Sequence, residues 1–316
     1  MNDMSKQRLS LDYVGYRDAA AAILSRQAGA QAVATFGLSD VFHESDLRPA
    51  YAFLEAQGRH GATTPALGML ALTHLGLPEE DSFGIPFGRD SLVAVPGGEA
   101  CEAVVVIVDQ PGTGLVALDV PAAESLADKR ADDYLRVLDS HSTPRRLLVP
   151  EPDVAPHRTG LLAKLQLGIS AELLGVSSRL LEDAIAYAKT RRQFGQPIGD
   201  FQAVQHLLAW AATDLHQLQC LFDIAVRQSA RENDPALARV VKATAGRTFH
   251  SIVQTATQVT GAISFTWEYS LNQLHHRGLS LDQMAGPSGD LVAEIGREIR
   301  VSGVVPVLHE LSDFVV

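Results

Sequence analysis

The sequence has few cysteines: Cys101 and Cys220 are the only two in 316 residues. They lie far from each other along the chain and from any cluster of histidines, which argues against a disulfide framework, a zinc site or a redox pair. We therefore predict that the chain binds no metal and that both cysteines are small, buried hydrophobic residues.

Long apolar runs and an excess of basic residues are also missing. No run approaches the roughly 20 apolar residues needed to span a bilayer, and the start, MNDMSKQRLSLDY, lacks the apolar core of a signal peptide, so we expect a cytoplasmic chain. The formal net charge is -11 and the basic residues are scattered, which argues against nucleic acid and membrane surfaces as partners. Hydrophobic residues make up 46% of the chain, enough for a buried core.

Three segments of different character follow one another. Residues 11–76 contain helix-like pieces such as YRDAAAAILSRQAG and LRPAYAFLEAQG. From about Ser82 the sequence carries short apolar runs, SLVAV, AVVVIV, GLVALDV and RRLLV, separated by turn residues with no room for crossover helices. Long amphipathic helices follow Pro156. The predicted fold is α+β, with an N-terminal helical domain (1–80), a small antiparallel β domain (81–155) and a C-terminal antiparallel helical bundle (156–316).

The bundle is predicted from three apolar stripes. The first repeats at steps of three and four over residues 162–184. The third has Asp234 as its N-cap, Pro235 in its first turn and a stop at Gly261. The second is expected to begin after Asp200 as N-cap. Its predicted apolar face comprises Val204, Leu207, Leu208, Leu215, Leu218 and Phe222.

The segment GTGLVA, residues 112–117, has the G-x-G-x-x-A form of a dinucleotide-binding turn. That turn works only where a helix begins, because the helix N-terminus carries the pyrophosphate. Here LVALDVP follows, which predicts another strand. A β-hairpin turn is therefore the better interpretation.

The segment RRQFGQPIGDFQAVQ, residues 191–205, joins the first two bundle helices. Cations at the end of a helix are favourable on electrostatic grounds alone, which explains the arginines without a ligand. The rest of the corner combines an aromatic ring, an amide and a guanidinium group on one exposed turn. This combination suits a nucleotide-like cofactor that is held from outside.

The corner resembles the acyl-CoA dehydrogenase family, flavin enzymes that introduce a 2,3-double bond into acyl-CoA thioesters. A second segment, QVTGAISFTWEY over residues 258–269, resembles that family's Q-x-x-G-G-x-G-F-x-x-E-Y, and the order of the three segments matches the family's domain order. The residues that follow the family pattern Y-x-x-x-R-x-Q-F-G-x-P-I-x-x-F-Q are Tyr187, Arg191, Gln193, Phe194, Gly195, Pro197, Ile198, Phe201 and Gln202.

This resemblance implies that the two segments reach across a subunit interface to the adenosine-diphosphate half of a neighbour's FAD. Arg191 would pair with the pyrophosphate, and Gln258 and Gly261 would close over the cofactor. The residues expected to line the dinucleotide are Gln193, Phe194 and Ile198. The family usually has glycines where Ala262 and Ser264 stand, so the approach of the backbone to the cofactor is altered there.

The family's general base is missing from the sequence. In the family a glutamate in an R-D-x-x-x-x-x-I-x-E-G-T arm abstracts the α-proton. Counting from Arg277, that position is Gly286. Some members carry the glutamate early in the first bundle helix instead, but Leu165 and Gln166 stand in that register, and Glu172 lies about two turns away. The β domain also lacks T-E-P, G-S-D and W-I-T-like segments that would bed the flavin ring.

These departures resemble the shortened, partner-dependent subunit of heterotetrameric acyl-CoA dehydrogenases that degrade steroid (cholesterol) side chains. GRHGATTPAL (58–67) and AGPSG (285–289) also look like that branch. We therefore expect a subunit without a base that contributes FAD contacts and shapes a wide pocket for a bulky acyl-CoA. A full-length dehydrogenase would be the partner, in a two-plus-two heterotetramer, and the chain alone would be inactive.

Two alternatives stay open. The chain could be a cofactor-free scaffold or regulator of a partner dehydrogenase, in which case the corner only packs. It could also be a homo-oligomeric enzyme that reuses the fold for another acyl-CoA reaction, with His275, His276 or Glu268 as catalyst.

Overall fold

The computed structural model describes residues 13–43, 46–77, 82–86, 92–96, 103–110, 113–119, 135–139, 145–149, 151–229, 234–266 and 269–304. Cys101, Glu268 and most side chains of the β segment lie outside this description. Predictions that concern those side chains therefore stay predictions.

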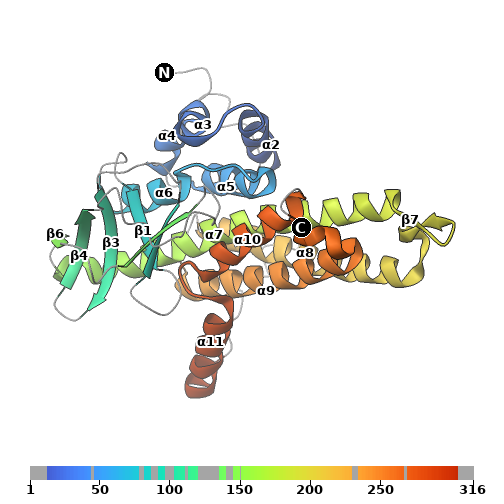
Figure 1. The fold of residues 1–316 in the computed structure, drawn as a ribbon. Coiled ribbons are helices and arrows are strands. Elements are labelled where there is room, and N and C mark those ends of the chain that lie inside the picture. The colour runs from blue at the N-terminus through green and yellow to red at the C-terminus, as the bar shows by residue number, and fades with distance from the viewer. Residues whose placement is uncertain are drawn as a thin grey trace, which may run out of the picture.

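The described part of the N-terminal layer is helical and lies over the long helices of the bundle (Figure 1). Helix α5 is buried over most of its length, and Ala50, Phe53 and Leu54 are fully buried. Gly61 ends α5 in the left-handed conformation, at φ 64°. The helices of this layer are α2 (Tyr13–Leu24), α3 (Gly29–Phe36), α4 (Leu38–Phe42), α5 (Arg48–His60) and α6 (Ala66–His74).

A six-stranded sheet lies at one end of the molecule (Figure 1). Its strand order is β5-β2-β1-β3-β4-β6, and every neighbouring pair is antiparallel except β1 and β3, which are parallel. Strands β3 and β4 form the hairpin predicted from GTGLVA, with Gln110 opposite Thr113. The strands are β1 (Ser82–Pro86), β2 (Leu92–Pro96), β3 (Ala103–Gln110), β4 (Thr113–Asp119), β5 (Leu135–Asp139) and β6 (Arg145–Val149).

Long helices make up the C-terminal half. Helix α7 runs over 40 residues, about 60 Å at 1.5 Å per residue. Helix α9 begins as predicted: the Asp234 carboxylate accepts hydrogen bonds from the amides of Ala236 and Leu237, and Gly261 follows the last residue. The helices are α7 (Glu151–Thr190), α8 (Gln202–Ser229), α9 (Pro235–Thr260), α10 (Ser270–Gln283) and α11 (Ser288–Ser302).

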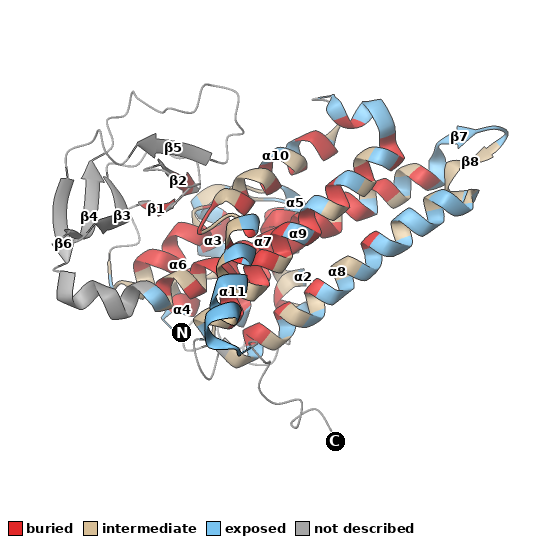
Figure 2. Cartoon of the chain, turned by 90° about the horizontal axis from the view of Figure 1, so that it is seen from below, coloured by how far each residue is buried: buried red, intermediate tan, exposed pale blue. Residues whose placement is uncertain are grey.

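Two details of the predicted elements are wrong. Asp200 lies in a short 3-10 turn (Ile198–Asp200), and the extended Phe201 precedes α8 in its place. Cys220 is exposed, one turn of α8 from His216, because no described part of the chain covers the outer side of α8 (Figure 2). Within the residues described, no helix combines the length and the hydropathy that a bilayer crossing requires.

Candidate functional site

The corner between α7 and α8 is a short β-hairpin at the tip of the bundle, formed by β7 (Arg192–Gln193) and β8 (Gln196–Pro197) (Figure 1). Its two turn residues both have positive φ: 51° at Phe194 and 85° at Gly195. A two-residue turn of this handedness matches the twist of the flanking strands. The amide of Ile198 donates to the Arg191 carbonyl at 2.8 Å and closes the hairpin onto α8.

The side chains of the hairpin face solvent. Phe194 is 93% exposed, and its ring meets the edge of Phe201 at 6.2 Å. The Arg192 guanidinium donates to the Gly195 carbonyl at 3.0 Å, inside the hairpin. Arg191, by contrast, is exposed and makes no side-chain hydrogen bond within the described part of the chain. Arg192 therefore supports the turn, and Arg191 is available to a ligand.

The second predicted segment lies toward the same end of the bundle. Tyr187, one turn before the corner, meets Tyr269 with ring centroids 6.5 Å apart, and Ser270 donates to Asp183 at 3.1 Å. Gln258 is exposed, and Gly261 has φ 70° with open space where a Cβ would be. The structure thus brings the predicted cofactor-binding residues to one end, where all but the half-buried Ile198 are exposed.

The loop after Gly261 carries Ala262 and Ser264, where the resemblance leads us to expect glycines. Residues Gly261–Phe265 form a 3-10 turn in which the buried Ser264 donates its hydroxyl to the Gly261 carbonyl at 2.7 Å. Ala262 is exposed, so its methyl group does not pack in the core. The substitutions at 262 and 264 are therefore compatible with an open loop.

The first half of α8 is more exposed than its apolar stripe predicts (Figure 2). Leu218 and Phe222 are buried, but Leu207 is 39% exposed, and Trp210, outside the predicted face, is 72% exposed. At the nearby end of α9, Phe265 is 69% exposed. Large exposed apolar side chains of this kind are typical of interaction surfaces.

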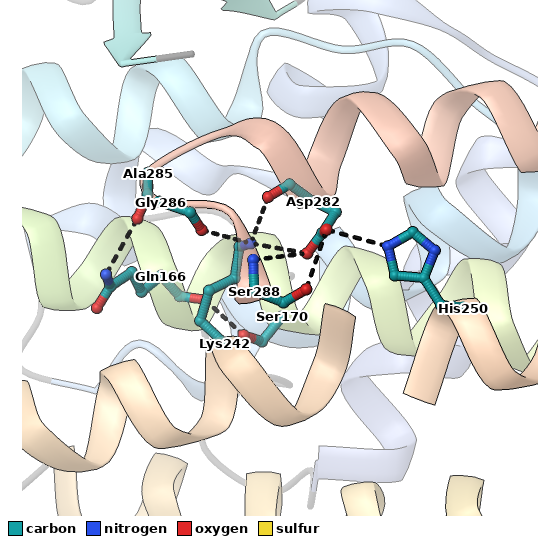
Figure 3. Close-up of polar contacts among 8 residues, drawn as sticks. All are labelled: Gln166, Ser170, Lys242, His250, Asp282, Ala285, Gly286 and Ser288. Atoms are coloured by element: carbon teal, nitrogen blue, oxygen red, sulfur yellow. Dashed lines mark hydrogen bonds and ion pairs between the residues drawn. The ribbon is translucent and has the colours of Figure 1, made fainter. Parts of the chain in front are cut away.

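The positions at which the resemblance leads us to expect a base, Gly286 and the pair Leu165 and Gln166, hold no carboxylate, and Gln166 lies beside the 285–286 turn (Figure 3). Gln166 is buried in α7 and donates its side-chain amide to the carbonyl of Ala285 at 3.1 Å. The next residue is Gly286, with φ 104°. A Cβ at 286 would lie 2.9 Å from Leu291 Cδ2. The backbone conformation and the nearby Leu291 side chain therefore favour glycine at position 286 over any residue with a Cβ.

Glu172 belongs to a buried structural network. Its side chain is fully buried, and one carboxylate oxygen accepts the guanidinium of Arg277 through Nε at 2.8 Å and through a second, shorter contact. The other oxygen accepts the Gln57 amide at 3.1 Å, and Thr64 donates in turn to Gln57. A carboxylate satisfied on both oxygens ties α5, α7 and α10 together and has no open side for a substrate proton.

A cluster that the sequence patterns did not predict involves the segment from Asp282 to Ser288, which we call the Gly286 arm. Lys242 of α9 is fully buried and donates to the carbonyls of Asp282 and Gly286, at 3.0 and 3.2 Å. The Asp282 carboxylate accepts from His250 Nε2 and from the hydroxyl of Ser288, each at 3.1 Å (Figure 3). The available signal was a lysine within the apolar stripe of the third helix, between Val241 and Ala243.

Burial and charge shift the cluster's titrations in opposite directions. Burial lowers the pKa of Lys242 to about 8, and the Asp282 charge acts against that shift. Burial alone would raise the pKa of Asp282, but the hydrogen bond from His250 and the charge of Lys242 hold it below its ordinary value. The pair is therefore ionised near neutral pH.

The histidines considered as catalysts lie elsewhere on α10. His275 is half-buried and stacks with the exposed His276 at 5.9 Å. Burial, followed by the influence of His276 and His250, lowers the pKa of His275. Neither side chain joins the Gly286 arm among the contacts described.

The helical layer, the sheet and the helical bundle together form the architecture of the acyl-CoA dehydrogenase fold. Residues 159–299 match the family model described as acyl-CoA dehydrogenase, C-terminal domain. The bundle thus matches the C-terminal domain of acyl-CoA dehydrogenases, and the chain as a whole has the fold of that family.

Two curated relatives share the name acyl-CoA dehydrogenase IpdE2. The protein from Mycolicibacterium smegmatis is 30% identical over 44% of this chain and 44% of its own length. The protein from Mycobacterium tuberculosis is 26% identical over 80% of this chain and 78% of its length. The match thus spans less than half of the first relative.

Solved structures agree in fold across almost the whole chain. A variant of the steroid ACAD Tcur3481-Tcur3483 has a TM-score of 0.66 at 22% identity, covering 93% of this chain and 90% of its own. The ChsE4-ChsE5 complex from Mycobacterium tuberculosis has a TM-score of 0.60 at 20% identity, covering 94% of this chain and 92% of its own. A glutaryl-CoA dehydrogenase from Mycobacterium smegmatis in complex with FADH2 has a TM-score of 0.68 at 16% identity, covering 94% of this chain and 96% of its own.

Proposed function

We propose that this chain is the non-base subunit of a heteromeric, FAD-dependent acyl-CoA dehydrogenase. The observation that carries the proposal is an asymmetry in one molecule. The segments that would serve a neighbour's cofactor are present and largely exposed, while the positions expected for the base hold neutral residues, Gly286 in one register and Leu165 and Gln166 in the other. Such a chain contributes to a shared site and leaves proton abstraction to its partner.

The exposed end of the bundle suits the adenosine-diphosphate half of FAD. The free guanidinium of Arg191 can make a bidentate contact with pyrophosphate. Phe194 offers an uncovered ring and Gln193 an amide beside it, and Gly261 leaves open space for close approach. When bound, FAD would accept the hydride that leaves the acyl chain. This chain's residues would hold and orient the dinucleotide.

The partner would be a full-length dehydrogenase subunit that supplies the glutamate and the flavin bed, in a two-plus-two heterotetramer. Exposed Leu207, Trp210 and Phe265 fit an apolar contact with such a subunit. The similarity to a steroid ACAD and to a two-protein complex supports this arrangement and favours a bulky, steroid side-chain acyl-CoA as substrate. The product would carry a 2,3-double bond.

Co-expression with a candidate partner tests this proposal. The chain alone should be colourless and inactive, and the complex should be yellow, with about one FAD per pair of unlike chains. A yellow, active homo-oligomer would overturn the subunit assignment. An active complex whose flavin contacts only the partner would favour the scaffold alternative.

Arg191 and Arg192 provide a matched pair of variants for the cofactor contact. Arg191→Ala should weaken flavin retention in the complex by roughly 10- to 100-fold, because a charge-assisted contact is lost. Arg191→Lys should recover part of the loss, since an ammonium lacks the planar fork. Arg192→Ala removes the contact inside the hairpin and is the control. Equal flavin occupancy in all three would show that the corner is structural.

A further inference from the structure

The arm from Asp282 to Ser288 follows a strained path. Two consecutive residues have positive φ, 54° at Ala285 and 104° at Gly286. A left-handed alanine is costly for an L-residue, and such a conformation persists only where surrounding contacts determine it. The arm must therefore be held from outside its own sequence.

Two buried side chains hold the arm by its carbonyls (Figure 3). Gln166 binds the carbonyl of Ala285, and Lys242 binds those of Asp282 and Gly286. Lys242 also lies 3.5 Å from the Asp282 carboxylate. The three donors of its ammonium thus face three oxygens of one short segment.

Helix α9 is shaped to receive the arm at this place. Gly246 lies one turn after Lys242, and a Cβ there would lie 2.6 Å from Ser288 Cβ. The glycine lets the arm approach the helix, and the lysine fastens it there. The Ser288 amide, which donates to Asp282 at 3.3 Å, closes the segment.

We propose that Lys242 is a positioning residue, whose buried ammonium fixes the main-chain path that keeps position 286 free of any side chain. In this role the lysine acts through its contacts with Asp282 and Gly286 of the arm. The inference rests on the proposed function only in assigning this arm to one wall of the acyl-CoA site. The conformational claim concerns the chain itself.

A double-mutant cycle on the isolated chain tests the proposal, with urea unfolding as the readout. Gly286→Ala should lower the folding equilibrium constant roughly tenfold or more when Lys242 is present. In a Lys242→Met background the released arm can relax, so the same substitution should cost less than about threefold. Gly289→Ala, at a position with no neighbour within 4 Å, is the matched control and should be additive with Lys242→Met.

Hydrogen exchange provides a second readout. Lys242→Met should raise exchange of the 282–290 peptide about tenfold, whereas Ile252→Val, a buried change further along α9, should leave that peptide unchanged. If Lys242→Met does not fold, Lys242→Gln enters the same measurements. Additive effects at 242 and 286, or unaltered arm exchange, would overturn the proposal. Neither measurement involves flavin, so failure of the proposed function would not alter these outcomes.

Discussion

Gly286→Glu places a carboxylate where the family resemblance leads us to expect the general base, and we predict that this carboxylate does not act as one. The backbone at this position has φ 104°, and a Cβ would lie 2.9 and 3.2 Å from Leu291 Cδ2 and Cγ. The backbone strain costs about 1–3 kcal/mol, and forcing atoms into a packed site costs about 1–3 kcal/mol. We therefore expect the free energy of unfolding to fall by about 2–5 kcal/mol.

Urea unfolding of the purified chain measures this loss. Gly289→Ala is the control, because it lies three residues away with open space around it, and it should be neutral or slightly stabilising. Adding Leu291→Ala to Gly286→Ala should remove the part of the stability loss that comes from the clash with Leu291. The part that comes from the positive φ at position 286 should remain. Gly286→Glu within about 0.5 kcal/mol of the unmodified chain would refute the reasoning. Acyl-CoA oxidation by this variant alone would refute it more directly.

Two further predictions concern the buried charges. Glu172→Gln should lower the free energy of unfolding by about 3–5 kcal/mol, because Arg277 loses its buried partner. Turnover by assembled, flavin-loaded complexes should nevertheless stay within a few-fold of the unmodified complex. A much larger loss of turnover in such complexes would show that Glu172 is catalytic. Lys242 should make stability rise with pH above its folded-state pKa of about 8. Between pH 8 and 9.5 the unfolded chain keeps the proton that the folded chain loses, which adds up to about 1.4 kcal/mol per pH unit. Lys242→Met should abolish this rise in urea titrations, and parallel pH curves for both proteins would contradict it.

Sequence patterns predicted the helices best where their signals are local. Asp234 and Pro235 mark the start of α9, and Gly261 marks its end, because capping and left-handed turns depend on one or two residues. The turn at Gln110 and Thr113 was predictable for the same reason. The parallel pairing of β1 with β3 was not, since it joins strands that are not neighbours in sequence.

The candidate site shows the same division. The motif located Arg191 and Gln258, and the structure places both toward one end of the bundle, although their contact with FAD stays a prediction. The apolar stripe of α8 failed to predict exposure at Leu207, because periodicity identifies an apolar side but not what covers it. Lys242 was missed because its partners are main-chain carbonyls some 40 residues away, which carry no residue-type signal.

The hairpin at Phe194 has a consequence for proteolysis. It stands beyond the bundle on a ladder of two residue pairs, and exposed loop tips are preferred sites of nicking. A protease that cuts after large aromatic residues is therefore expected to cleave the isolated chain after Phe194. Because α7 and α8 each pack along α9, the two fragments would remain associated. In a complex where a partner covers this tip, the bond would resist cleavage. The rate of cleavage at Phe194 would thus report whether the chain is bound to a partner. This measurement needs no flavin absorbance, substrate or turnover.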